Sequence, residues 1–243
     1  MSERIYGLHA VRALLTRHPE RLLALHILAG REDPRMRDVL RAANGKKIER
    51  VDAARLKSMI GDVAHQGVVA EVEPLKPWRE EDLLEALRIA KDPLLLVLDG
   101  VQDPHNLGAC LRTADACGAI AVVVPRDRAA QVTPTVRKVA AGAAESTPVV
   151  QVTNLARSLK LFKDAGLWVV GADASATQAV YEADLTGGRA LVMGAEGAGL
   201  RDLTRKTCDL LVSLPQRGSV ESLNVSVASG MLLYEALRQR LNT

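Results

Sequence analysis

Short runs of Leu, Val, Ile and Ala in the C-terminal two-thirds of the chain constrain its fold most strongly. A strand that is apolar along its whole length must be buried on both faces, as in a parallel sheet covered by helices. Helical stretches separate the runs, so the sequence predicts an α/β fold with a mostly parallel sheet. The expected strands are residues 94–99, 120–124, 167–171, 190–193 and 210–214, and the expected helices include residues 134–144, 154–165 and 223–241.

The first 72 residues have their own alternation of helix and strand patterns, which predicts a separate small α/β domain. The expected helices are residues 9–15, 34–43 and 53–59, and the expected strands are residues 22–28, 47–51 and 67–72. Residues 73–92 are acidic and contain Pro74 and Pro77, with an amphipathic piece at residues 82–89. We therefore expect a domain of residues 1–72, a linker of residues 73–92 and a domain of residues 93–243.

Three loops of the C-terminal domain each follow an expected strand, and ligands bind at the carboxyl ends of strands in such sheets. The first loop and its helix read DPHNLGACLRTA, the second reads GAEGAGL, and the third reads LPQRGSVESLNVSVA. In the first, Cys110 and Cys117 belong to the apolar stripe of a helix, while Arg112 lies nearly opposite that stripe. These positions predict one ligand site built from all three loops.

Each loop also has an ordinary structural interpretation. Ser222 and Asn224 suit the start of a helix, where they cap free amides. Gly194, Gly197 and Gly199 can form a turn with a solvated Glu196, and an outward Arg112 can simply face water. The spacing of the glycines is not the dinucleotide-binding fingerprint. No single loop identifies the ligand.

Together the three segments resemble the motifs of the SpoU/TrmH family of RNA ribose 2'-O-methyltransferases in the SPOUT superfamily. The stretches IYGLHAVRALL and AHQGVVAEV resemble the small RNA-binding domain of the family members that methylate a guanosine of 23S ribosomal RNA. The resemblance covers nearly the whole chain. One departure is Ala195, where many relatives carry Asn.

The resemblance implies a deep trefoil knot in the C-terminal domain, S-adenosyl-L-methionine as the cofactor, a homodimer and 23S ribosomal RNA as the substrate. It implies a methyltransferase that modifies the ribose 2'-hydroxyl of a guanosine. It places the cofactor on Met193, Gly194, Gly199, Leu214 and Leu223. It places Asn106, Arg112, Glu196, Ser222 and Asn224 around the ribose hydroxyl. Because a guanidinium holds its proton firmly, we interpret Arg112 as a phosphate clamp that stabilises developing negative charge.

Charge is unevenly distributed along the chain, whose net charge is +3. Residues 1–72 carry 13 Lys and Arg against 9 Asp and Glu. A basic cluster there suits phosphate contacts, although a solvated helix surface explains it equally well. Aromatic residues make up 2% of the chain, which argues against base stacking on exposed rings. The cluster consists of Arg31, Arg35, Arg37, Arg41, Lys46, Lys47 and Arg50.

Cysteine and histidine usage predicts neither disulfides nor a metal site. Cys110, Cys117 and Cys208 form no CxxC pair, and the five His residues are scattered singly. The chain has no apolar run long enough to span a membrane and no hydrophobic signal segment. We therefore expect a soluble cytoplasmic protein.

Two other functions fit the same motifs. One is a family member that acts on transfer RNA, although those enzymes usually lack the N-terminal module. The other is a ribosome-associated RNA-binding protein without enzymatic activity. The presence of Asn106, Arg112, Glu196 and Asn224 together argues against the second, since a binding module needs no such set.

Overall fold

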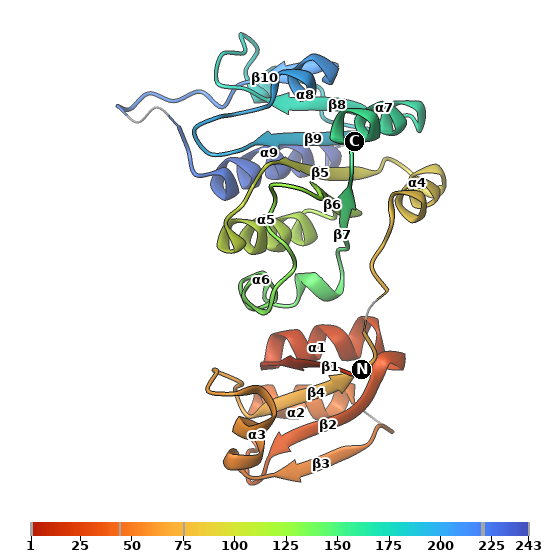
Figure 1. Cartoon of the computed structure of the whole chain (residues 1–243), viewed down its shortest axis with the longest axis vertical. Coiled ribbons are helices and arrows are strands. Elements are labelled where there is room, and N and C mark those ends of the chain that lie inside the picture. The colour runs from red at the N-terminus through yellow and green to blue at the C-terminus, as the bar shows by residue number, and fades with distance from the viewer. Residues whose placement is uncertain (1, 44, 75, 220–221, 243) are drawn as a thin grey trace. The chain divides into compact units, whose positions relative to one another are not determined.

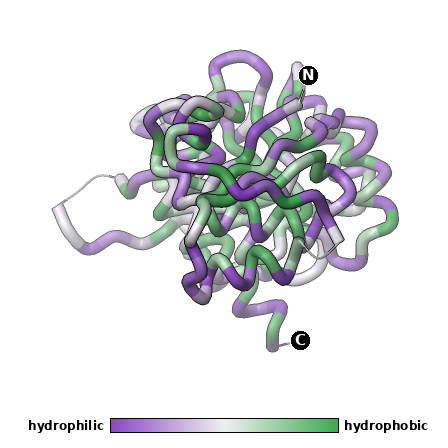
Figure 2. The backbone as a smooth tube through the Cα atoms, turned by 90° about the horizontal axis from the view of Figure 1, so that it is seen from below, coloured by the Kyte–Doolittle hydropathy of each residue, from purple (hydrophilic) through white to green (hydrophobic). Residues whose placement is uncertain are grey.

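The computed structural model describes residues 2–43, 45–74, 76–219 and 222–242, and it divides into two compact units. The first unit comprises residues 1–76 with residues 141–146, and the second comprises residues 77–140 and 147–243. Figure 1 shows both units along the chain. Hydrophilic residues predominate on the outer turns of the backbone, and hydrophobic residues are concentrated further inside (Figure 2).

The N-terminal unit is a four-stranded sheet in the order β1-β4-β2-β3. β2 and β3 are parallel, and β4 is antiparallel to both β1 and β2. α1 and α2 pack into one core with the sheet, and α3 packs into a second, smaller core. The elements are β1 (Glu3–Tyr6), α1 (Leu8–Arg17), η1 (Pro19–Arg21), β2 (Leu22–Leu28), α2 (Pro34–Ala42), β3 (Ile48–Val51), α3 (Ala53–Ile60) and β4 (Val68–Val72).

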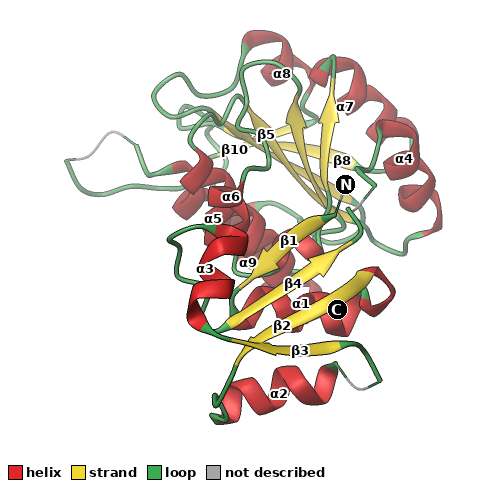
Figure 3. Cartoon of the chain, turned by 60° about the horizontal axis from the view of Figure 1, so that its bottom comes forward, coloured by secondary structure: helices red, strands yellow, loops and turns green. Residues whose placement is uncertain are grey.

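The C-terminal unit contains a six-stranded, wholly parallel sheet in the order β10-β8-β9-β5-β6-β7. Helices cover both faces (Figure 3): α4, α7 and α8 lie on one side and α5, α6 and α9 on the other. The strands are β5 (Leu94–Asp99), β6 (Ala121–Pro125), β7 (Val149–Val152), β8 (Trp168–Ala172), β9 (Arg189–Gly194) and β10 (Leu210–Val212). The helices are α4 (Glu80–Ile89), α5 (Pro104–Ala116), α6 (Pro134–Ala140), α7 (Leu155–Asp164), η3 (Val180–Glu182), α8 (Asp202–Thr207) and α9 (Val225–Arg240). The short helix η2 (Ala143–Glu145) follows α6 along the chain but belongs to the first unit.

The parallel sheet is confirmed, and its central strands are largely buried, as their apolar composition requires. β5 is buried at every position. β1, β7 and α8 were not predicted. β1 and β7 are edge strands of only four residues. Their sequences, ERIY and VVQV, include polar residues, so neither forms a continuous apolar run.

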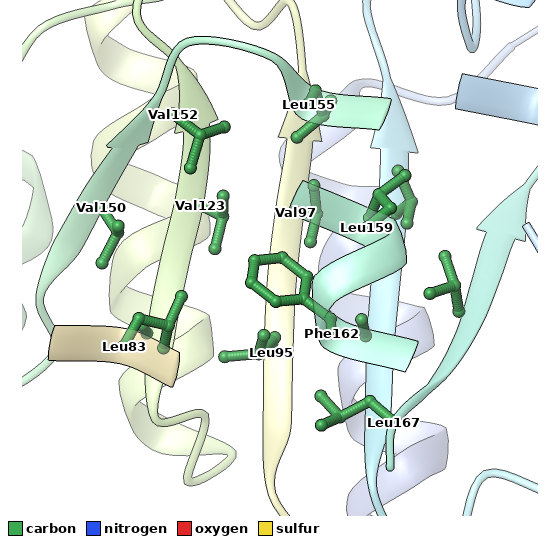
Figure 4. Close-up of a cluster of buried hydrophobic side chains, with 14 of the residues drawn as sticks. Leu83, Leu95, Val97, Val123, Val150, Val152, Leu155, Leu159, Phe162 and Leu167 are labelled. Atoms are coloured by element: carbon green, nitrogen blue, oxygen red, sulfur yellow. The ribbon is translucent and has the colours of Figure 1, made fainter. Parts of the chain in front are cut away.

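α4 lies inside the stretch expected as a linker, but it packs into the core of the C-terminal unit. Leu83 is 0% exposed and Leu87 is 2% exposed. Both belong to the cluster that includes Leu95 of β5 and Phe162 of α7 (Figure 4). Full burial of a Leu side chain contributes about 1.5–3 kcal/mol. The amphipathic pattern of residues 82–89 therefore marks a helix of the second unit.

Candidate functional site

The glycine loop, residues 194–200, follows β9 and folds back tightly on itself. The Ala195 amide donates to the Gly199 carbonyl at 3.1 Å, and the Gly199 amide donates to the Ala195 carbonyl at 2.9 Å. A Cβ on Gly194 would lie 2.1 Å from the Gly199 carbonyl carbon, so only glycine fits there. Gly197 and Gly199 have φ of +74° and +66°, the left-handed region that favours glycine. The glycines thus permit a close turn that presents Glu196 at its exposed end.

Asn224 is the N-cap of α9, one position before the helix rather than in its first turn. Its side-chain oxygen accepts from the amides of Ser226 at 2.9 Å and Val227 at 3.4 Å. These amides have no partner within the helix, which is why an Asn side chain fixes the helix start here. Capping occupies Asn224 Oδ1 and leaves its amide nitrogen to point elsewhere.

Asn106 lies in the first turn of α5, which begins with Pro104 and is capped by Asp103. It is 9% exposed, and a buried amide of this kind needs hydrogen-bond partners. Asn106 Nδ2 donates to Glu196 Oε1 at 3.2 Å, and Asn106 Oδ1 accepts from Asn224 Nδ2 at 3.0 Å. Both partners come from the other two predicted loops.

Glu196 completes this triad. Its Oε1 also accepts from Asn224 Nδ2 at 2.7 Å and from the Val225 amide at 3.4 Å. The Val225 amide is at the N-terminus of α9, where the helix dipole favours negative charge. A single carboxylate oxygen therefore ties all three loops together. We call Asn106, Glu196 and Asn224 the loop triad.

Arg112 and Ser222 are not part of the loop triad. Both are exposed, and neither makes a hydrogen bond or ion pair with any other residue that the structure describes. Arg112 follows Asn106 by six helical positions, which places it about 9 Å along the α5 axis and roughly 120° around it. The two side chains therefore leave the helix on different faces. Arg112 is available to a ligand that extends beyond the triad.

α5 is held in place by close packing on two sides. A Cβ on Gly108 would lie 2.7 Å from Val139 Cβ of α6, so Gly108 lets α5 and α6 approach closely. On the α9 side, Cys110 Sγ donates to Ser229 Oγ at 3.5 Å, and burial raises the pKa of the Cys110 thiol to about 11. Such a thiol is unreactive. The prediction that Cys110 and Cys117 face the core is confirmed.

A cavity of about 540 Å³ lies between η3, the loop after β10 and α9. Leu214 and Leu223 line it, together with Tyr181, Met231 and Glu235. Arg238 donates hydrogen bonds to Glu235 and holds the pKa of that carboxyl at about 2, so Glu235 is ionised and paired at a cavity wall that also includes Arg217. Tyr181 and Glu235 were not predicted, because nothing in the local sequence distinguishes them from ordinary surface residues.

The other predicted cofactor residues lie on β9 and the glycine loop. Met193 is buried in the sheet, Gly194 is half-buried and Gly199 is exposed. Leu223 directly precedes the capping Asn224, so the cavity wall and the loop triad are adjacent along the chain. The five predicted cofactor residues are thus divided among the cavity (Leu214 and Leu223), β9 (Met193) and the glycine loop (Gly194 and Gly199).

Asp99 and Arg201 were also missed by the sequence analysis. Asp99 ends β5 and is 1% exposed, and it accepts from Arg201 Nε at 2.6 Å and from the Arg201 amide at 3.1 Å. Arg201 directly follows the glycine loop. The signal in the sequence was an acidic residue that ends a strand of apolar residues.

Across the described parts of the chain, no three His, Cys, Asp or Glu side chains are grouped so as to hold a metal ion. No helix in those parts is long and apolar enough to span a membrane. The loop triad together with Arg112 and Ser222 offers two side-chain amides, one carboxylate, one guanidinium and one hydroxyl. Such a set can position a hydroxyl group and stabilise charge.

Comparison with known proteins gives the following matches. A family model described as the SpoU rRNA Methylase family matches residues 93–234, and one described as RNA 2'-O ribose methyltransferase substrate binding matches residues 4–78. The chain is 53% identical over 246 aligned residues to the 23S rRNA (guanosine-2'-O-)-methyltransferase RlmB of Haemophilus influenzae, with 100% of each chain covered.

Solved structures agree with this. The SpoU methyltransferase AviRb from Streptomyces viridochromogenes in complex with AdoMet matches with a TM-score of 0.77 and 29% identity, covering 99% of this chain and 91% of that one. The TrmH/SpoU tRNA modifying enzyme of A. aeolicus matches with a TM-score of 0.57 and 30% identity, covering 67% of this chain and 85% of that one.

Proposed function

Because the chain belongs to the SpoU rRNA methylase family, we propose that it transfers a methyl group from S-adenosylmethionine to a guanosine ribose 2'-hydroxyl in 23S ribosomal RNA. The loop triad is the observation that carries this proposal. It joins, through one carboxylate oxygen, the three loops that follow β5, β9 and β10. The full-length likeness to RlmB enzymes supports the choice of substrate.

The residues present fit the cofactor. The cavity of about 540 Å³ falls within the range of roughly 300–1,000 Å³ that small-molecule sites occupy. Leu214 and Leu223 supply its apolar walls, and Tyr181 and Glu235 supply polar groups. We place Met193, Gly194 and Gly199 at the edge of the same site, where the glycine loop lets a ligand approach the main chain. S-adenosylmethionine, when bound, supplies an electrophilic methyl group.

In the proposed mechanism the protein positions the ribose and stabilises charge. The hydroxyl oxygen must lie in line with the bond that breaks, and holding it there contributes much of the rate. The loop triad fixes the relative position of the three loops. Ser222, whose hydroxyl is exposed, orients the ribose hydroxyl, and Arg112 binds a phosphate and stabilises the negative charge that develops as the proton leaves.

The N-terminal unit is proposed to bind the RNA substrate, and the C-terminal unit to carry out the chemistry. Of the basic cluster, Arg31, Arg41 and Lys47 form ion pairs with neighbouring acidic residues. Arg35, Arg37 and Arg50 are exposed, and none forms an ion pair with another described residue. These three are the members best placed to contact phosphates, and binding through them should weaken with salt.

Ribosomal RNA is favoured over transfer RNA because the A. aeolicus tRNA modifying enzyme matches only 67% of this chain. A match of that extent leaves room for an additional substrate-binding unit, and residues 4–78 match a substrate-binding family. A binding protein without activity is disfavoured because the loop triad is fully formed. Three free cysteines fit the reducing cytoplasm, which is the proposed location.

We also propose that the chain forms a homodimer through α9, although most apolar residues of this helix are covered within their own chain. Val225, Ala228, Leu232, Leu233 and Ala236 are buried within their own chain, and Leu237 is half-buried. A different stripe of α9 is exposed, formed by Val227 (47%), Met231 (49%) and Tyr234 (67%). Their spacing of four and three residues places them on one helix face, which a second copy would cover.

One assay tests the function directly. The protein is incubated with tritiated S-adenosylmethionine and either large-subunit RNA or transfer RNA, and the modified ribose is then mapped. We expect label in large-subunit RNA, at one guanosine 2'-oxygen, and no label with an Asn106→Ala variant. Label in transfer RNA alone would contradict the proposed substrate, and label on a base would contradict the proposed chemistry.

A further inference from the structure

We infer that Asp99 and Arg201 form a positioning pair that fixes the glycine loop for cofactor binding. The inference rests on the proposed function and assigns a role to two residues outside the set already described. Asp99 is the last residue of β5 and pairs in register with Gly194, the last residue of β9. Arg201 lies at the other end of the loop, directly before α8. The pair therefore closes the base of the loop.

The contacts between the two residues are multiple. Asp99 Oδ1 accepts from Arg201 Nε at 2.6 Å and also contacts Nη2, and Asp99 Oδ2 accepts from the Arg201 main-chain amide at 3.1 Å. The carboxylate thus holds both the side chain and the backbone of Arg201. Because a guanidinium is planar, such charge-assisted hydrogen bonds fix the orientation of the Arg201 side chain as well as its distance from Asp99.

The position of Asp99 joins two parts of the site. Gly100 follows it with φ of +95° and turns the chain toward α5, which carries Asn106. The glycine loop, which carries Glu196, ends with Leu200, whose side chain is in the core. The next residue, Arg201, donates its main-chain amide to Asp99. Asp99 therefore sets the distance between the two loops whose residues meet in the triad.

Stability alone is a poor explanation for the pair. A buried ion pair often contributes no more to stability than well-packed apolar residues of the same volume. Here the Asp99 side chain is 0% exposed while that of Arg201 is 52% exposed, so burial of the carboxylate is costly. The buried Asp99 carboxylate is explained if it fixes the position of Arg201 and the glycine loop more closely than apolar packing would.

The matched control is Asp209, at the opposite edge of the same sheet. Its Oδ2 accepts from the Val169 amide at 2.9 Å, and its Oδ1 pairs with Lys163 Nζ at 2.8 Å. Like Asp99, it binds one main-chain amide and one cation, but it directly precedes β10 and its partners lie on β8 and α7 rather than on the glycine loop. Asp209→Asn therefore removes a similar interaction without touching the site.

The experiment measures S-adenosylmethionine affinity by calorimetry for the full-length wild type, Asp99→Asn and Asp209→Asn. We expect Asp99→Asn to weaken binding on the order of 10-fold, the effect that loss of a supporting partner has at metal sites, and Asp209→Asn to leave it unchanged. Arg201→Ala should weaken binding similarly, and the double variant Asp99→Asn/Arg201→Ala should be no worse than either single variant.

Tryptic cleavage after Arg201 gives a second measurement that does not depend on affinity. It should be faster in Asp99→Asn than in the wild type and unchanged in Asp209→Asn, at a temperature where all three are folded by circular dichroism. Equal affinity and equal cleavage for Asp99→Asn and the wild type would overturn the inference. Failure of the wild type itself to bind the cofactor would instead refute the proposed function.

Discussion

Replacing Gly194 by Ala tests whether the glycine loop works through close backbone packing. The new Cβ would lie 2.1 Å from the Gly199 carbonyl carbon and 2.4 Å from the Leu200 amide nitrogen, whereas real Cβ contacts are essentially never under 3.0 Å. The loop must therefore move by roughly 0.9 Å, the difference between these limits. Overpacking of this kind costs about 1–3 kcal/mol of folding stability.

The same movement would disrupt the loop triad. Glu196 is in the displaced loop, and its 2.7 Å contact with Asn224 would lengthen or change direction. A misplacement of about 1 Å lowers a rate by about 10². We therefore expect Gly194→Ala to lower kcat by about that factor and to weaken cofactor binding. Methyl transfer and calorimetry measure the two effects, and urea unfolding measures stability.

Gly197→Ala is the control for this prediction. Gly197 has nothing within 4 Å of an added Cβ, but its φ is +74°. Ala in this conformation is strained by about 1–2 kcal/mol, so the two variants lose comparable stability by different causes. We expect Gly197→Ala to keep cofactor affinity and kcat within a few-fold of the wild type. A Gly194→Ala protein that is folded and fully active would refute the reasoning from close packing.

Four further outcomes are expected. Arg112→Ala should lower kcat by at least about 10² with cofactor affinity nearly unchanged, because it acts on developing charge; loss of calorimetric cofactor binding would show a different role. A fragment of residues 77–243 should fold and bind cofactor but lose most RNA affinity, and residues 93–243, which lack α4, should unfold at lower urea concentration; full RNA binding by either would contradict the division of labour. If Arg112 serves the partner's site, Arg112→Ala and Asn224→Ala chains that are refolded together should recover roughly a quarter of wild-type activity by random pairing. No recovery in mixed dimers verified by mass spectrometry would show that each site is built within one chain. Because the pKa of Glu235 is lowered to about 2, the stability that its ion pair contributes should be complete above its ordinary value of 4.5 and lost as pH falls toward 2; urea unfolding of Glu235→Gln should therefore differ from wild type at pH 7 and converge with it as pH falls, and a constant difference would contradict this.

The sequence by itself determined the fold class and the edge of the sheet where the three loops meet. A strand that is apolar at every position, such as β5, can be satisfied only between two layers, so its composition predicts the parallel sheet. Prolines and glycines end the elements locally, which is why β2 and β5 were predicted at their observed bounds. Because parallel strands present their carboxyl ends at one edge, the three loops had to meet there.

Only the tertiary structure decided which loop residues touch. Glu196 contacts Asn106 and Asn224 across 90 and 28 positions of sequence, and Asp99 contacts Arg201 across 102. Such contacts depend on strand order and on the path of each loop, neither of which leaves a periodic signal in the chain. Local composition gives each residue its secondary structure, but the strand order β10-β8-β9-β5-β6-β7 gives it its neighbours.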